Sequence, residues 1–335
     1  MTKNNSNQSP IESVGIDVGK DNLSICLAHK NQTQSVFEIK NNRQEINEFM
    51  RNYLKHYKNK IIMESTGRFH LLLALMLSEN QLDVRVLNPL ISKKYSASSI
   101  RKVKSDKQDA IMLSTIAFKE EKLPAKFSLT KEQLGIRKKI TLIASLEKQI
   151  QQLSSIVKDF SETKKILEIP FSETELKIFE TIHELVKQKD KLEKEVATES
   201  AQNNFNKNEQ VFSSITGVSP YLATVASMFF SEQYLESPKQ WIAFVGLDVS
   251  VRQSGKWKGR CSLTKRGNAY LRKRLYSAAW GAKMHSEKFR AYYDKLRKDG
   301  RTYVEALNII ARKIVRIMFI LVKNGTMFDA EKIIF

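Results

Sequence analysis

The stretch SVGIDVGKDNLSICLAHKNQTQSVFEI, residues 13–39, indicates how the N-terminal part of this chain folds. It contains three runs of apolar and β-branched residues, at 13–18, 23–29 and 35–39. Such runs are typical of strands, and the short segments between them are rich in Gly, Lys, Asp and Asn, which favour turns. Strands joined by such short turns pair with their neighbours in antiparallel order. The sequence therefore opens with a predicted three-stranded meander.

Beyond the meander, helix and strand patterns alternate. They predict a helix at 45–57, a strand at 60–64, a helix at 70–79 capped by Ser65 or Thr66, a strand at 83–87, and helices at 90–98 and 106–119. Three strands followed by alternating helices and strands predict an α/β layer with a mixed sheet, the order found in ribonuclease-H-like folds. We expect this α/β domain to span 12–125, after a disordered tail at 1–11.

The segment 131–199 has a different composition. Glycine nearly vanishes, and aliphatic residues recur every three or four positions on both sides of a break near Pro170. This spacing predicts two long helices that form an antiparallel coiled-coil hairpin at 130–200; a helical pair inside a globular bundle is the alternative. The rest of the chain, at 208–330, is predicted to be a mostly helical and strongly basic domain.

The net charge narrows the class of partner. The chain has 56 Lys and Arg against 36 Asp and Glu, a formal charge of +20. Such an excess favours a nucleic-acid partner, because Lys and Arg neutralise phosphates and release counterions; the alternative is a merely basic protein. The two cysteines offer no disulfide framework or zinc spacing, and the polar N-terminus is unlike a signal peptide. We expect a cytoplasmic protein that is not bound to a membrane.

Four acidic residues form a candidate metal site. Asp17 alternates with Val14, Ile16 and Val18 and so points to the other face of its strand, while Glu64 ends a buried strand. Asp106 and Asp109 lie three apart at a helix start, where acids also stabilise the helix dipole, which is their simplest explanation. Together the four carboxylates supply the oxygen ligands that Mg²⁺ prefers, in an arrangement suited to phosphodiester chemistry.

A second candidate site contains a serine. Ser254 precedes Gly255 in a glycine-containing loop, where most serines simply form a turn. A hydroxyl attacks phosphate only with help from a base, a metal or nearby cations. Trp257, Tyr270 and Tyr276 interleave the charge and could either stack on bases or pack in the core. The candidate nucleic-acid-binding cations are Arg252, Lys256, Lys258, Arg260, Lys265, Arg266, Arg272 and Arg274, and a solvated basic face is the alternative.

These motifs resemble a known family. GIDVGK at 15–20, MESTGRFH at 63–70, Asn88-Pro89 and KVKSDKQDA at 102–110 are similar to the DEDD transposases of the insertion-sequence 110 family, which includes Piv-type DNA invertases. The resemblance covers roughly 12–120 and 208–323. It implies a RuvC-like first domain that holds the four acids, and a second, transposase domain. Gly19 stands where members often have Ser, and Val249 stands where they often have Pro.

The resemblance also implies a mechanism and partners. Ser254 would be the nucleophile that forms a covalent phosphoserine link to DNA, with Mg²⁺ at the four acids. A noncoding bridge RNA would pair with donor and target DNA, and dimers would assemble into a tetramer. Three alternatives remain open: a RuvC-like nuclease in which water attacks, a Piv-type invertase without an RNA guide, and a non-catalytic nucleic-acid-binding scaffold.

Overall fold

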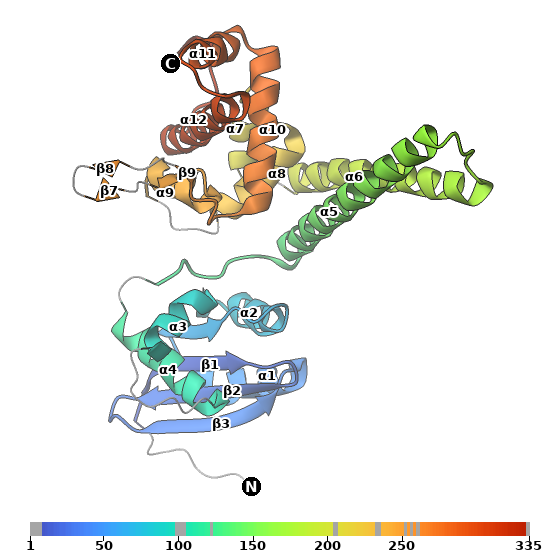
Figure 1. Cartoon of the computed structure of the whole chain (residues 1–335). Helices are drawn as coiled ribbons and strands as arrows, with labels where there is room; N and C mark the ends of the chain where they lie inside the picture. Colours follow the sequence, from blue (N-terminus) through green and yellow to red (C-terminus); the bar gives the residue numbers. More distant parts are fainter. Residues whose placement is uncertain are drawn as a thin grey trace. The chain divides into compact units, whose positions relative to one another are not determined.

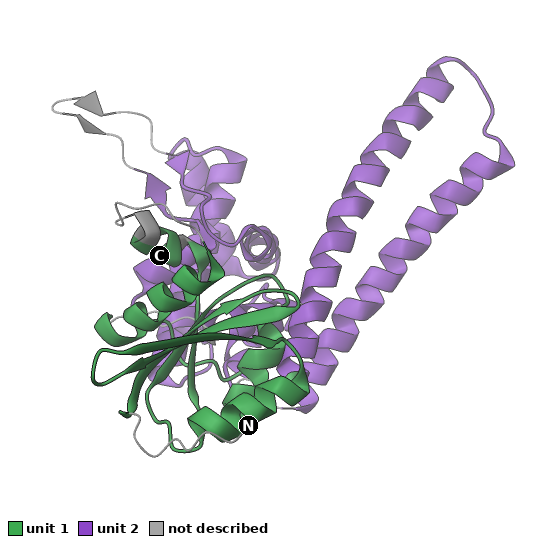
Figure 2. Cartoon of the chain, turned by 90° about the horizontal axis from the view of Figure 1, so that it is seen from below, with its two compact units in different colours: residues 1–131 green, residues 132–335 purple. Residues whose placement is uncertain are grey.

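The computed structural model describes residues 9–97, 105–120, 123–203, 207–231, 236–250, 253–254, 257–258 and 262–332. Most of the predicted tail at 1–11 lies outside these residues. The chain divides into two compact units, residues 1–131 and 132–335, which Figure 2 shows in green and purple. We describe each unit by itself.

Unit 1 is built on a five-stranded sheet with the order β3-β2-β1-β4-β5. The strands are β1 (Ile11–Val18), β2 (Asn22–His29), β3 (Gln34–Lys40), β4 (Lys60–Glu64) and β5 (Asp83–Leu87). The first three form the antiparallel meander, whereas β4 and β5 run parallel to β1 and to each other. This arrangement confirms the predicted α/β domain with a mixed sheet.

Helices cover both faces of the sheet. The helix α1 (Arg43–Phe49), which continues into a π-helical turn at Met50–Leu54, and the helix α2 (His70–Glu79) bury one face in a core that contains Val14, Ile16 and Val18. The helix α4 (Asp106–Lys119) packs on the opposite face, across β1 and β4 (Figure 1). The remaining helix, α3 (Pro89–Ala97), follows β5 directly.

The start of α2 differs from the prediction. Neither Ser65 nor Thr66 caps this helix, because Phe69 occupies the N-cap position and makes no side-chain cap hydrogen bond. The Phe69 nitrogen donates instead to the Thr66 oxygen at 3.0 Å, so a turn separates β4 from the first helical residue. The capping residues that the sequence suggested therefore belong to the turn after Glu64.

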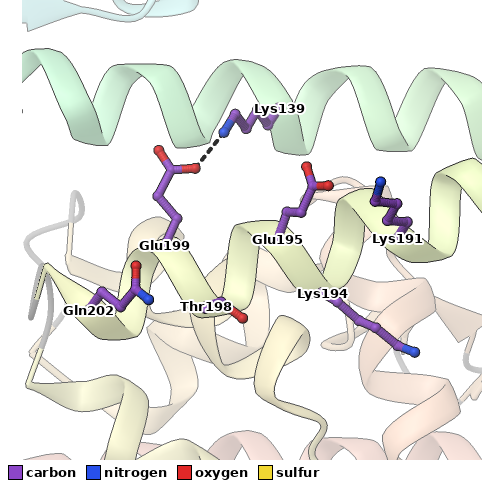
Figure 3. Close-up of a pocket in the computed structure, with 7 residues that line it drawn as sticks. All are labelled: Lys139, Lys191, Lys194, Glu195, Thr198, Glu199 and Gln202. Atoms are coloured by element: carbon purple, nitrogen blue, oxygen red, sulfur yellow. Dashed lines mark hydrogen bonds and ion pairs between the residues drawn. The ribbon is translucent and has the colours of Figure 1, made fainter.

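Unit 2 begins with a hairpin of two long helices, α5 (Lys131–Ile166) and α6 (Glu173–Gln202) (Figure 1). Ion pairs near both ends join them in antiparallel order: Lys164 with Glu175 at 2.6 Å, and Lys139 with Glu199. A groove of about 420 Å³ lies between the helices beside Lys139, Lys191 and Glu195 (Figure 3). The helical hairpin is present, and its supercoiling as a coiled coil stays a prediction.

The rest of unit 2 is a helical bundle around one core. Its helices are α7 (Asn208–Ser213), α8 (Pro220–Ser231), α9 (Pro238–Val245), α10 (Ala269–His285), α11 (Glu287–Lys298) and α12 (Tyr303–Asn324), followed by a short 3-10 turn at Ala330–Lys332. Residues of all six helices and of the hairpin base share this core. Within the described ranges, every helix is too short or too polar to cross a membrane.

Two short antiparallel ladders interrupt the helices, where the sequence predicted a loop. The strand β6 (Val249–Ser250) pairs with β9 (Ser262–Leu263), and β7 (Gln253–Ser254) pairs with β8 (Trp257–Lys258). Strands of two residues carry no periodicity that a sequence pattern can reveal, which explains why they were not predicted.

Candidate functional site

The sheet register places Asp17 and Glu64 beside each other. The strands β1 and β4 are parallel, with Gly15 paired to Ile62 and Ile16 paired to Met63, so the next residue along each strand is an acid. Val14, Ile16 and Val18 belong to the core under α1 and α2, whereas Ile62 belongs to the core under α4. By strand alternation, Asp17 and Glu64 both face α4, as the sequence predicted for Asp17.

The first turn of α4 supplies the other two acids. Ser105 caps the helix by accepting a hydrogen bond from the Gln108 nitrogen, and both Asp106 and Asp109 lie in that first turn. The helix is close to the sheet because Gly15 has no side chain: a Cβ atom there would lie 2.1 Å from the Ser114 nitrogen. The close approach brings the N-terminal end of α4 over the ends of β1 and β4.

The charges of Asp106, Asp109 and Glu64 all act on Asp17. Burial, the largest cause, and the negative charges of Asp106, Asp109 and Glu64 together raise the pKa of Asp17 from 3.8 to about 6. Mutual repulsion of this kind is relieved by a bound cation or by protonation. The carboxylates fit the oxygen chemistry of a hard divalent cation. As the side chains stand in the described part of the chain, no three acids, histidines or cysteines are grouped closely enough to hold one metal ion.

Two residues that sequence reasoning missed hold the surroundings of these acids. The buried hydroxyl of Ser92, in α3, donates to Glu64 Oε2 at 2.7 Å. The Asn41 amide Nδ2 donates to the Gly19 oxygen and to the Phe69 oxygen, both at 3.1 Å. Asn41 therefore connects the turn that follows Asp17 with the segment that follows Glu64. The one sequence signal that could have indicated Ser92 is Pro89, which starts α3 three residues before it.

The predicted nucleophile Ser254 is the last residue of β7, and its backbone pairs with that of Trp257. Of Ser254, Trp257 and Lys258 the structure describes the backbone only, and Arg252, Lys256 and Arg260 lie outside the described residues. The structure thus brings the four acids together in unit 1, and it places Ser254 in a ladder of unit 2.

Close backbone contacts hold the two ends of the segment that contains β7. Gly246 ends α9 with a φ of 74°, and a Cβ atom on Gly267 would lie 2.1 Å from the Phe244 oxygen. The Thr264 nitrogen donates to the Asp248 oxygen at 2.9 Å, next to the pairing of β6 with β9. These contacts fix the two points at which the chain leaves and re-enters the helical bundle on either side of Ser254.

The described cations differ in their availability. Lys265 and Arg266 are exposed. Arg272 donates to the Val245 oxygen at 2.8 Å and so holds the end of α9. Within unit 2 these residues lie in or just before α10, close in sequence to the ladder of β6 with β9.

Arg274 is held by the protein itself. Its Nη2 lies 2.5 Å from Glu193 Oε1 and 3.5 Å from Glu147 Oε1, and its side chain is only 17% exposed. It also donates to the Tyr270 hydroxyl at 2.9 Å, and that hydroxyl lies 2.8 Å from the Tyr221 hydroxyl. Arg274 and Tyr270 thus join α10 to the hairpin and to α8, where the sequence suggested surface contacts with nucleic acid.

Comparison with known proteins gives consistent matches along most of the chain. The model of the IS110 DEDD transposase matches residues 14–162, and the model described as "Transposase IS116/IS110/IS902 family" matches residues 209–294. An insertion element IS110 protein of 43.6 kDa from Streptomyces coelicolor is 25% identical over 89 residues, which cover 27% of this chain and 22% of that protein.

The pilin gene-inverting protein of Moraxella bovis is 32% identical over 112 residues, which cover 32% of this chain and 34% of that protein. The corresponding protein of Moraxella lacunata is 32% identical over 111 residues, with the same two shares. The chain thus spans about a fifth to a third of the length of these curated relatives. From the two family matches, which include all four acids and Ser254, we conclude that the chain belongs to the IS110 family of transposases.

Proposed function

We propose that this chain is a transposase that cleaves and rejoins DNA strands with a serine nucleophile and a metal site of four carboxylates. The observation that carries the proposal is the placement of Glu64, Asp106 and Asp109 around Asp17, whose pKa rises to about 6 through its burial and the charges of these three acids. The chain has a net charge of +20, so a group of four acids is unusual in it. Binding of a divalent cation explains why they are grouped.

In this proposal Asp17, Glu64, Asp106 and Asp109 hold Mg²⁺. An ion held by these residues would supply neutralisation of the phosphate charge and polarisation of its oxygens. The acids come from two strand ends and a helix start, so the backbone fixes their directions, and Ser92 orients Glu64 by its hydrogen bond. Lys265 and Arg266 are exposed and suited to hold nearby phosphates.

The proposed reaction is a transesterification. The Ser254 oxygen forms a bond to phosphorus, the phosphodiester bond to one deoxyribose oxygen breaks, and the hydroxyl proton ends on that leaving oxygen. The reverse reaction with a hydroxyl of another strand restores the phosphodiester and frees the serine. The number of phosphoester bonds is unchanged at each step, so strands are rejoined without net hydrolysis.

The partners that we propose are donor DNA, target DNA and a noncoding bridge RNA that selects both by base pairing, at the bacterial nucleoid. The charge of +20 supports binding of more than one polyanion. A dimer that pairs into a tetramer is supported by the hairpin, where large apolar side chains remain in water: Ile156 is 65% exposed and Ile166 is 81% exposed.

A strand-cleavage assay tests the proposal. The substrate is a plasmid that carries the DNA on both sides of the coding sequence, with Mg²⁺ and RNA transcribed from the same DNA. We expect Ser254→Ala and Asp17→Asn each to abolish cleavage, while Ser262→Ala, in the neighbouring ladder, cleaves like wild type. Cleavage by Ser254→Ala would favour a RuvC-like nuclease in which water attacks. Full activity of Asp17→Asn would contradict the metal site, and a wild-type protein that binds the DNA without cleaving it would favour a non-catalytic scaffold.

Inversion of a DNA segment is a second candidate function. The 32% identity to the pilin gene-inverting proteins favours it. A plasmid with two sites in inverted orientation, incubated with and without the flanking RNA, separates the two functions. RNA-independent inversion would support the invertase, whereas RNA-dependent joining of donor to target would support the guided transposase.

A further inference from the structure

The end of α10 and the start of α12 expose large side chains that the fold does not use. Trp280 is 48% exposed and Met284 is 42% exposed on α10, while Tyr303 is 43% and Val304 is 55% exposed on α12. The opposite side of α10 buries Leu271, Leu275, Ala278, Ala279 and Ala282 in the bundle core. Trp280 therefore is not needed to seal that core, and an indole left in water indicates a binding surface.

We name the surface at this end of α10 and α12 the α10 platform: Tyr276, Trp280, Lys283, Met284, Tyr303 and Val304. The buried Tyr293 of α11, which is 6% exposed, joins Lys283 to Tyr303 beneath it. The Lys283 ammonium lies 4.3 Å from the ring centre of Tyr293 and 5.8 Å from that of Tyr303. The two tyrosine rings are 6.1 Å apart and meet edge to face. Lys283 thus connects the end of α10 with the first residue of α12.

Trp280 belongs to this surface by helical spacing. Tyr276 is one turn before Trp280, and Lys283 and Met284 are one turn after it, so all lie on the same side of α10. Burial raises the pKa of Tyr276, and the charges of the nearby Tyr303 and Tyr293 hydroxyls raise it further. Trp280 is therefore flanked on both sides by residues that reach Tyr303.

Positive charge borders the aromatic rings. The exposed Arg290 donates from Nη2 to the Met284 oxygen at 2.7 Å, which keeps its guanidinium at the end of α10. Lys283 is within the platform itself. Aromatic faces with cations beside them are the combination that binds single-stranded nucleic acid, since every base has a face to stack and every nucleotide has a phosphate.

We propose that the α10 platform binds unpaired bases of a nucleic-acid strand, which stack on Trp280 and Tyr303 while Lys283 and Arg290 contact the adjacent phosphates. This site rests on the proposed nucleic-acid function and adds a place for the strand that is unpaired during recombination. A second copy of the chain is the less favoured occupant, because the cations Lys283 and Arg290 beside the rings favour a polyanion.

Fluorescence titration of the full chain tests the platform, with oligo(dT) and oligo(U) of 20 nucleotides as probes. We expect stacking to quench the Trp280 emission, and Trp280→Ala and Tyr303→Ala to weaken binding about tenfold each. Trp280→Phe should bind like wild type yet lose the quenching. The matched control is Phe118→Ala, which removes an aromatic side chain that is 61% exposed on α4 and should leave binding unchanged.

Two outcomes would overturn the proposal. In the first, Trp280→Ala and Tyr303→Ala bind the oligonucleotides as tightly as wild type does. In the second, these variants lose self-association in light scattering while their oligonucleotide binding stays intact. Stronger binding of oligo(U) or of oligo(dT) would support the platform and identify the strand as RNA or DNA. Because Ser254→Ala and Asp17→Asn should still bind the oligonucleotides, failure of the platform can be distinguished from failure of the catalytic proposal.

Discussion

Gly15 in β1 lies so close to Ser114 in α4 that a Cβ atom on the glycine would be 2.1 Å from the serine nitrogen. The same atom would be 2.3 Å from the Ala110 oxygen, so backbone meets the glycine on two sides. Two residues after Gly15, on the same face of the strand, stands Asp17. The contact between glycine and helix therefore sets how close Asp106 and Asp109 come to Asp17.

The first prediction follows from this contact. Gly15→Ala should lower the free energy of unfolding by about 3 kcal/mol, because backbone cannot rotate away from the new methyl group. Chemical denaturation followed by circular dichroism measures the change. Gly135→Ala is the matched control, since a Cβ atom there meets nothing within 4 Å in the exposed start of α5; it should stabilise the chain by about 0.5–1 kcal/mol. Equal effects of both substitutions would show that α4 does not rest on Gly15.

The second prediction concerns pH. The pKa of Asp17 is about 6 in the folded chain, against an ordinary value of 3.8, so the folded state binds more protons than the unfolded state between these values. Protonation of Asp17 therefore stabilises the folded state as the pH falls through 6, and this contribution is lost as the pH rises above 6. One pKa unit corresponds to about 1.4 kcal/mol, and solvent screening at a partly buried site reduces the free-energy difference that the whole pKa shift would give.

We accordingly expect Asp17→Asn to raise the unfolding free energy of the metal-free protein by about 2 kcal/mol at pH 8 and by progressively less below pH 6. Urea titrations of both proteins across this range measure the difference. Asp159→Asn, an exposed acid of α5, should show no such dependence. A difference that is constant with pH would mean that neither burial nor the three neighbouring acids raise the pKa of Asp17.

The third prediction assigns Asn41 a positioning role. Its amide joins the Gly19 and Phe69 oxygens, so Asn41→Ala should loosen the segments after Asp17 and Glu64 and weaken Mn²⁺ binding about 10- to 100-fold. Calorimetric titration with Mn²⁺ measures this affinity. The control is Asn59→Ala, because Asn59 also donates Nδ2 to a backbone oxygen, that of Glu12, but next to the first residue of β4 instead of its last. Equal Mn²⁺ affinities in both variants would leave Asn41 with a purely structural role.

The fourth prediction separates two adjacent cations of α10. Arg274→Gln should cost about 3 kcal/mol of stability, because Glu193 and Glu147 would lose the guanidinium between them. Lys273→Gln should change stability by less than about 0.5 kcal/mol, since Lys273 is 51% exposed and its contact with Glu147 is 3.4 Å. Thermal unfolding of both variants tests this contrast. If instead Lys273→Gln destabilised as much, the buried network would not be what joins α10 to the hairpin.

Much of unit 1 could be predicted because its signals are local. Strand alternation gave the direction of Asp17, and the spacing of three residues at a helix start gave the common side of Asp106 and Asp109. The contact of Gly15 with Ser114 and the hydrogen bonds of Asn41 join residues distant in the chain, and no periodic pattern records such contacts. Asn41 therefore escaped notice although it joins the segments that follow Asp17 and Glu64.

Arg274 shows the same limit for charge. The sequence displays a basic run before and within α10, but it does not show that Glu193, 81 residues away, forms an ion pair with one member. In the sequence, an exposed arginine or lysine looks the same as one that is held in an ion pair. Only the packing of α10 on α6 distinguishes the two. The sequence thus predicted the basic character of unit 2 but not which cations are free to meet phosphate.

The most direct test of the central claim is mass spectrometry of the peptide that contains Ser254. The peptide is prepared after denaturant has stopped a reaction with DNA and Mg²⁺ while it is in progress. We predict a nucleotide covalently attached to Ser254 in the wild-type protein and no adduct in Asp17→Asn or Asp106→Asn. An adduct on another residue, or cleaved DNA without any adduct, would contradict the proposal that four carboxylates prepare a phosphate for attack by this serine.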